Sequence, residues 1–162
     1  MYIFNISATD GSKAWLEEHK IDLCALSSAL SLLVTEIHPT VKVIPKNITL
    51  RVVPNSDASH YAFKTNKISL CDEPYDRKYD SLAKKQKDIF DHFLHEFRHW
   101  MQSQFYNIGV REISYDDDDV INNTNNYYRN KLEIDARQFV RAYLTKFTKY
   151  YKTFVKIGQR SS

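Results

Sequence analysis

Residues 91–104 contain three side chains in an order that can hold a metal ion. His95, Glu96 and His99 follow the pattern H-E-x-x-H. Because residues four positions apart are neighbours on a helix surface, the two imidazoles can converge on one tetrahedral ion. Glu96 is rotated away from both histidines, so it can reach a water molecule without ligating the metal. The motif therefore predicts Zn²⁺ as the cofactor and Glu96 as the base that accepts a proton from water.

A simpler interpretation of the same residues stays open. The chain has six histidines, and H-E-x-x-H would arise by chance in roughly one such sequence in a hundred. In that interpretation the segment is an amphipathic helix with two stacked surface histidines and no metal. A third ligand is needed to favour the metal site, because a catalytic zinc ion takes three protein ligands and keeps one position open.

A second short motif offers that ligand. Within residues 127–139 (YYRNKLEIDARQF), Glu133, Ala136 and Phe139 stand in the order E-x-x-A-x-x-F. Together with H-E-x-x-H, this pattern resembles the gluzincin branch of the zincin metallopeptidases. The compact size and the E-x-x-A spacing are most similar to the small ImmA/IrrE-type peptidases and to minimal zincins encoded by phages or mobile elements.

The resemblance implies a zinc-dependent metallopeptidase that hydrolyses peptide bonds. His95, His99 and Glu133 would be the zinc ligands, and Glu96 would activate the attacking water. A peptide or protein substrate would lie extended along an edge strand, for which residues 61–70 (YAFKTNKISL) are the candidate. Taken alone, Glu133 can also be an acidic residue near the beginning of a helix, where it favours the helix dipole.

The chain departs from the family pattern at two positions. Arg98 stands where glycine is common and Arg137 stands where asparagine is common. These departures leave open a catalytically silent zincin-fold protein of a phage or mobile element, with a binding or regulatory role. A fourth protein ligand, for which His92 and Asp135 are the candidates, would favour such a structural site over an enzyme.

Other residues near the motifs can assist a catalytic site. A transition-state oxyanion needs a hydrogen-bond donor, and we assign this role to Tyr128, with Tyr127 as the alternative. Asp91 and His92 can orient a ligand imidazole or lie on the polar face of the helix. Gln102 can line the cleft or face solvent.

Hydrophobic periodicity predicts the elements before the motif. Apolar residues recur at three- and four-residue steps over residues 23–37, which indicates a helix. Alternating apolar residues over 47–53 predict a strand, and Pro45 separates it from a short strand over 41–44. Residues 61–70 predict two further short strands around an intervening turn.

Two long helices are expected after these strands. The first begins near Asp80 or Ser81, either of which can cap it, and runs to about Phe105. It presents the histidines on a polar face and its aromatic residues to the core. A polar loop follows that contains four consecutive aspartates, residues 116–119. This run lacks the glycine and the distal glutamate of a calcium loop, so a solvated segment is expected.

The last helix is expected to begin at Arg129 or Asn130, and its tail should fray from about residue 158. The predicted fold class is α+β. Residues 1–162 would form a single zincin-like domain with an N-terminal helix, a small mostly antiparallel sheet, an active-site helix and a C-terminal helix.

Composition limits the classes of function. The net charge of +3 predicts neither a nucleic-acid partner nor a membrane surface. Cys24 and Cys71 are expected to be buried free thiols. The N-terminus lacks a basic region and a long apolar core, so a cytoplasmic protein is expected, in a host cell if a phage encodes it. The sequence predicts no particular oligomeric state.

Overall fold

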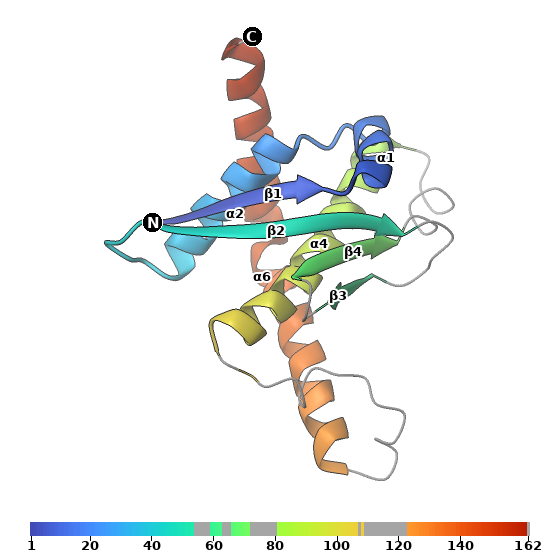
Figure 1. Cartoon of the computed structure of the whole chain (residues 1–162), viewed down its shortest axis with the longest axis vertical. Coiled ribbons are helices and arrows are strands. Elements are labelled where there is room, and N and C mark those ends of the chain that lie inside the picture. The colour runs from blue at the N-terminus through green and yellow to red at the C-terminus, as the bar shows by residue number, and fades with distance from the viewer. Residues whose placement is uncertain (54–58, 63–65, 72–80, 107, 109–122, 162) are drawn as a thin grey trace.

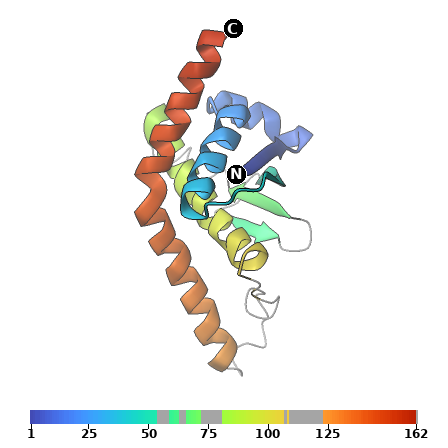
Figure 2. The ribbon, with the colours of Figure 1, turned by 90° about the vertical axis from the view of Figure 1, so that its left-hand side faces the viewer.

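A four-stranded sheet and two layers of helices make up the computed structural model. The structure describes residues 1–53, 59–62, 66–71, 81–106, 108 and 123–161, with the backbone alone for 123–130 and 161. Strands β1 (Tyr2–Ala8), β2 (Ile44–Val53), β4 (Lys67–Cys71) and β3 (His60–Ala62) lie in that spatial order. Helices α2 (Leu23–Ile37) and α4 (Leu82–Gln104) cover one face, and α6 (Asn123–Ser161) packs across them (Figure 1, Figure 2). A short 3-10 turn (Asp10–Ser12) and α1 (Lys13–Glu18) follow β1. The predicted α+β class is confirmed.

The prediction of a mostly antiparallel sheet is wrong. Strand β1 pairs in parallel with β2, and β2 pairs in parallel with β4; β3 alone runs antiparallel, against β4. One of the two parallel pairs involves a strand that was not predicted, β1, whose Phe4 and Ile6 are buried. Helix α2 connects β1 to β2, and a β-α-β connection of this kind gives parallel strands. The other pair is parallel because β4, rather than β3, lies next to β2.

Pro45 does not interrupt β2, contrary to the prediction. The Ile44 amide donates to the Met1 carbonyl, on the β1 side. The nitrogen of the next residue, Pro45, therefore points away from β1, towards the side of β4. The pairing of β2 with β4 starts only at Thr49, so no strand faces Pro45 on that side. Because no ladder hydrogen bond is needed there, the missing amide hydrogen of proline does not weaken the sheet.

The outer edge of β1 is covered by hydroxyl groups of α2. The amides of Tyr2, Phe4 and Ile6 donate to one hydroxyl each, at 3.0, 2.8 and 3.0 Å. The acceptors are Thr35, Ser31 and Ser27 respectively. Spacing by four residues places these hydroxyls on one helix face, while every second amide of a strand points to the same edge. In the described part of the sheet, β3 forms the opposite edge, where the Tyr61 backbone is hydrogen-bonded to the Glu96 side chain.

Helix α4 begins and ends close to the predicted positions. The Ser81 hydroxyl accepts a hydrogen bond from the Lys84 amide and caps the helix. The aromatic face is buried, and Phe4 of β1 makes edge contacts with Phe97 and Trp100 at ring separations of 5.4 Å. This packing anchors the helix on one side and leaves its opposite side available for chemistry.

Helix α6 begins earlier than predicted, at Asn123 rather than at residue 129 or 130, and it ends at Ser161. Residues 158–160 are exposed, and the fraying of this tail stays a prediction. Residues 123–126 contain three asparagines, which are weak helix formers, so the sequence gives little signal for this start. Ala136, Phe139 and Phe147 of α6 are buried.

Both cysteines are free, as predicted, but only Cys71 is buried; Cys24 is exposed on α2. Among the helices that the structure describes, none is both long and apolar enough to span a bilayer. The aspartate run at residues 116–119 lies outside the described residues.

Candidate metal centre

Three metal-ligating side chains meet between α4 and α6. The Nε2 atom of His95 lies 2.9 Å from Oε2 of Glu133, and Nε2 of His99 lies 3.0 Å from Oε1 of the same carboxylate. One ligand atom from each residue falls within 4.8 Å of the others. The predicted convergence of these three residues is therefore confirmed, and within the described part of the chain they form a group that could hold a metal ion.

The two helices approach closely at this point for reasons that the sequence contains. Ala136 is fully buried and Phe139 is almost so, one and nearly two turns after Glu133. The small alanine allows α6 to lie near α4, and the aromatic side chain fixes the face that α6 presents. The imidazoles lie one turn apart on α4, with ring centroids 5.0 Å apart and planes at 80°.

The donor set fits a catalytic type of metal site. Two imidazole nitrogens and one carboxylate oxygen are the three protein ligands of many zinc hydrolases, which leave one position open. Donors about 2.1 Å from a tetrahedral ion lie about 3.4 Å from each other. The nitrogen–oxygen separations of 2.9 and 3.0 Å would have to widen by about 0.4–0.5 Å, which a small side-chain shift provides.

The charges of the cluster are strongly coupled. Burial alone would raise the pKa of Glu133, but hydrogen bonds from His95 and His99 outweigh it and lower that pKa far below its usual value. Burial would lower the pKa of His99, but the bonds to Glu133 and Gln102 outweigh it and raise that pKa. The Glu133 carboxylate therefore favours its anionic form where it faces both imidazoles.

Glu96 lies beside the three ligands without joining them. Its side chain is buried, and burial raises the pKa of its carboxyl, while the nearby imidazoles of His99 and His95 act in the opposite direction. A hydrogen bond with the backbone of Tyr61 also lowers this pKa. Glu96 is therefore a carboxyl group with an increased proton affinity, located between the ligands and strand β3.

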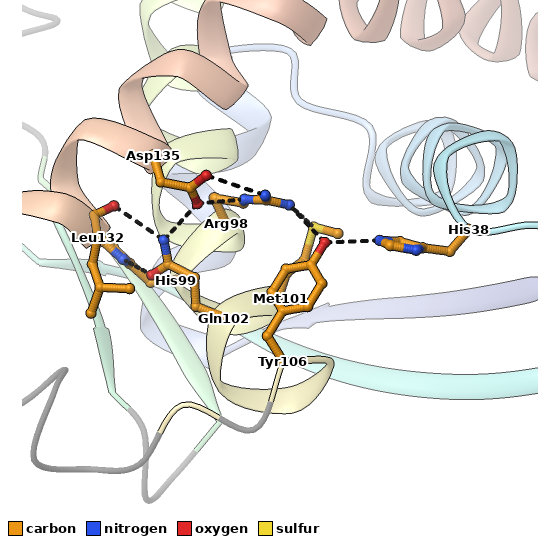
Figure 3. A network of polar contacts seen from close by, with 8 residues as sticks. All are labelled: His38, Arg98, His99, Met101, Gln102, Tyr106, Leu132 and Asp135. Carbon is orange, nitrogen blue, oxygen red and sulfur yellow. Dashed lines mark hydrogen bonds and ion pairs between the residues drawn. The ribbon is translucent and has the colours of Figure 1, made fainter. Parts of the chain in front are cut away.

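Gln102 is a functional candidate whose role the sequence did not identify. It was predicted either to line a cleft or to face solvent, yet it is 1% exposed. Its Oε1 accepts a hydrogen bond from Nδ1 of His99 at 2.8 Å, and its Nε2 donates to the Leu132 carbonyl and to Asp135 (Figure 3). Its spacing of three residues after His99 was the available signal, since such residues are neighbours on a helix.

Asp135 and His92, the two candidates for a fourth ligand, lie in other interactions. Asp135 binds Arg98 and Gln102. His92 lies 3.0 Å from the Ser59 hydroxyl through Nδ1 and 3.9 Å from Asp88 through Nε2. Neither belongs to the described group of metal-ligating atoms.

The remaining site predictions are not tested by the geometry. The side chains of Tyr127 and Tyr128 lie outside the described residues, so the oxyanion donor stays a prediction. Asp91 is half-buried on α4. Glu96 has the location of a base, but its catalytic role also stays a prediction.

Comparisons with known proteins do not assign a family to this site. No protein-family model, curated protein or solved structure matches the chain. The geometry itself is compatible with the zincin pattern in its two histidines and its glutamate from a later helix.

Proposed function

We propose that this protein is a zinc-dependent metallopeptidase of the gluzincin type. His95, His99 and Glu133 hold Zn²⁺, and Glu96 is the general base. The observation that supports the proposal most strongly is the reach of the Glu133 carboxylate, from a separate helix, to both imidazoles at 2.9 and 3.0 Å. A chance pair of surface histidines has no reason to meet a carboxylate 34 residues further along the chain.

Zinc is the metal that suits this donor set. Imidazole nitrogens favour borderline ions over Mg²⁺ and Ca²⁺, which prefer oxygen ligands. Three protein ligands with a free fourth position are typical of catalytic zinc, whereas structural zinc is enclosed by four. The engagement of Asp135 by Arg98 and of His92 by Ser59 favours the open arrangement.

The chemistry divides between the metal and Glu96. When bound, zinc is a Lewis acid that polarises a carbonyl and lowers the pKa of water towards about 7. Glu96 accepts the proton of the attacking water on its carboxylate and delivers it to the leaving amine. Its buried position, which raises the pKa of the carboxyl, strengthens it as a proton acceptor at neutral pH. Tyr128 is the proposed oxyanion donor.

Strand β3 is the proposed substrate-binding edge. An extended peptide can add a strand to a sheet edge through main-chain hydrogen bonds. Here it would pair with those backbone groups of β3 that Glu96 does not bind. The opposite edge of the described sheet, β1, has its amides covered by hydroxyls of α2. The hydrogen bond of Glu96 with the Tyr61 backbone places β3 next to the proposed base, so a peptide on this edge would pass the metal site.

Metal content and hydrolysis measured together test the proposal. Glu133→Ala should lose bound zinc, whereas Glu96→Gln should keep zinc and lose hydrolysis of a peptide library by about 10²–10⁴-fold. Glu17→Gln, at an exposed position of α1, is the matched control and should change neither quantity. Full zinc occupancy in Glu133→Ala would overturn the ligand assignment.

A catalytically silent, zinc-holding protein is the second candidate function. Arg98, a departure from the family pattern, has a side chain that is 16% exposed and pairs with Asp135 two residues after Glu133. Such an anchored site is also suited to holding zinc as part of a binding or regulatory surface, in an intracellular protein of a phage or mobile element. Stoichiometric zinc in the wild type without hydrolysis of any peptide would favour this function.

A further inference from the structure

Gln102 contacts the candidate metal centre from both of its helices. Its carboxamide oxygen accepts the Nδ1 hydrogen of His99 at 2.8 Å. Its nitrogen donates to the Leu132 carbonyl at 3.1 Å and to Oδ2 of Asp135 at 2.8 Å. Leu132 immediately precedes Glu133 and Asp135 follows it by two residues. The buried Gln102 side chain therefore contacts one proposed ligand, His99. It also binds α6 on both sides of another proposed ligand, Glu133.

The α6 side of this arrangement is itself held in place. Arg98 binds Asp135 at two points, 2.8 Å from Nε to Oδ2 and 3.3 Å from Nη2 to Oδ1. The Arg98 guanidinium also lies over the Phe139 ring, 4.9 Å from its centroid, and donates to the Tyr106 hydroxyl at 3.2 Å. Figure 3 shows Arg98, Asp135, Tyr106 and Gln102 joined in one network.

This anchoring acts on the N-terminal part of α6, which also carries Glu133. In Figure 1 and Figure 2 this part of α6 extends past the sheet and beyond the end of α4. The contacts of Gln102 and Arg98 hold α6 against α4 on the stretch next to Glu133, so they contribute to the distance from Glu133 to the imidazoles.

We propose that Gln102 is a positioning residue that aligns His99 and Glu133 for the metal ion. The inference rests on the proposed metal site. By accepting the Nδ1 hydrogen, Gln102 leaves the lone pair of His99 on Nε2, the atom that faces Glu133. By donating to α6, it fixes the helix that carries Glu133. A carboxamide alone combines the acceptor and the two donor hydrogens that these contacts need.

Gln102→Met tests the proposal, because methionine has a similar volume and cannot make these hydrogen bonds. Zinc affinity, measured by competition with a chromophoric chelator, should fall by about 10- to 100-fold. The visible absorption of the cobalt-substituted protein should also change, since it reports ligand geometry rather than stability. Ser103→Ala is the matched control at the next position, which is also polar and buried, and both readouts should equal those of the wild type.

Two results would overturn the inference. The first is a zinc affinity of Gln102→Met within twofold of the wild type. The second is an equal loss in Gln102→Met and Ser103→Ala, which would reflect a general weakening of α4. If Glu133→Ala loses zinc while Gln102→Met keeps it, the positioning role of Gln102 is wrong but the proposed metal site is retained. If the wild type binds no zinc, the proposed metal site is wrong as well.

A measurement on the wild type applies even where Gln102→Met does not fold. Long-range ¹H–¹⁵N correlation spectra of the zinc-loaded protein give the tautomer of each imidazole. The proposal expects His99 to carry its hydrogen on Nδ1, with Nε2 as the ligating atom. A zinc-loaded His99 that carries its hydrogen on Nε2 would contradict the role of Gln102.

Discussion

Arg98 on α4 and Asp135 on α6 form a two-point ion pair, with 2.8 Å between Nε and Oδ2 and 3.3 Å between Nη2 and Oδ1. This pair gives a structural role to a residue that departs from the zincin pattern, because Arg98 links the two helices that carry the candidate metal centre. It also removes Asp135 from the set of candidate ligands. Burial by itself would raise the pKa of Asp135, but the bonds from Arg98 and Gln102 outweigh it and lower that pKa.

The first prediction concerns the strength of this pair. A double-mutant cycle with Arg98→Met and Asp135→Asn should give a coupling free energy of about 1 kcal/mol, since Asp135 is 39% exposed and solvent screens part of the attraction. Urea unfolding of the metal-free variants measures it. A cycle between Asp135→Asn and the distant Glu36→Gln should give no coupling, and a similar value in both cycles would contradict a specific pair.

The two histidines of the candidate metal centre could be predicted from the sequence because their geometry is local. His95 and His99 are one helical turn apart on any helix, so their convergence needs only that residues 82–104 are helical. Glu133 was identified in another way, through the resemblance of its spacing to Ala136 and Phe139 to the gluzincin pattern. The structure confirms that the three side chains meet.

Interactions between distant segments were not predictable in the same way. Arg98 and Asp135 both stand out in the sequence, but their ion pair could not be predicted from it. Their contact depends on how α4 and α6 cross. Strand β1 was missed although Phe4 and Ile6 alternate, since a short alternating run is a weak signal without its partner strand. With β1 missing, the sheet could not be recognised as mainly parallel.

The second prediction concerns the hydroxyls that cover β1. Ser31→Ala should lower the free energy of unfolding by about 1–2 kcal/mol, because the Phe4 amide loses its acceptor in a partly buried position. Ser28→Ala on the same helix is the control, with an expected change within about 0.5 kcal/mol. Chemical denaturation measures both changes. Equal losses in the two variants would contradict a specific contribution of the Phe4–Ser31 hydrogen bond to the free energy of unfolding.

The third prediction concerns the pH dependence of an α2–α6 contact. The Tyr150 hydroxyl and the Lys146 ammonium hydrogen-bond Glu36 and hold the pKa of its carboxyl below the usual 4.5. A pKa that is lower in the folded state contributes stability above the unfolded value, and this stability is lost as pH falls through the folded value. Glu36→Gln should therefore destabilise the protein at pH 7 and progressively less below about pH 4.5.

Thermal unfolding at several pH values measures this difference. Glu17→Gln removes the same charge from an exposed position of α1 and should show little effect at any pH. An effect of Glu36→Gln that stays constant from pH 7 to pH 3 would contradict the role of the carboxylate, and would indicate that shape or packing is responsible instead.

The fourth prediction links helix packing to metal binding. Ala136 is fully buried where α6 meets α4, so Ala136→Leu should push the helices apart and destabilise the metal-free protein by about 1–3 kcal/mol. It should also weaken zinc binding, because Glu133 is carried one turn earlier on the same helix and moves away from the imidazoles. Ile134→Ala, at a half-exposed position of α6, is the control. Isothermal titration with zinc distinguishes the outcomes: unchanged zinc affinity in a destabilised Ala136→Leu would mean that the approach of the two helices does not set the position of the third ligand.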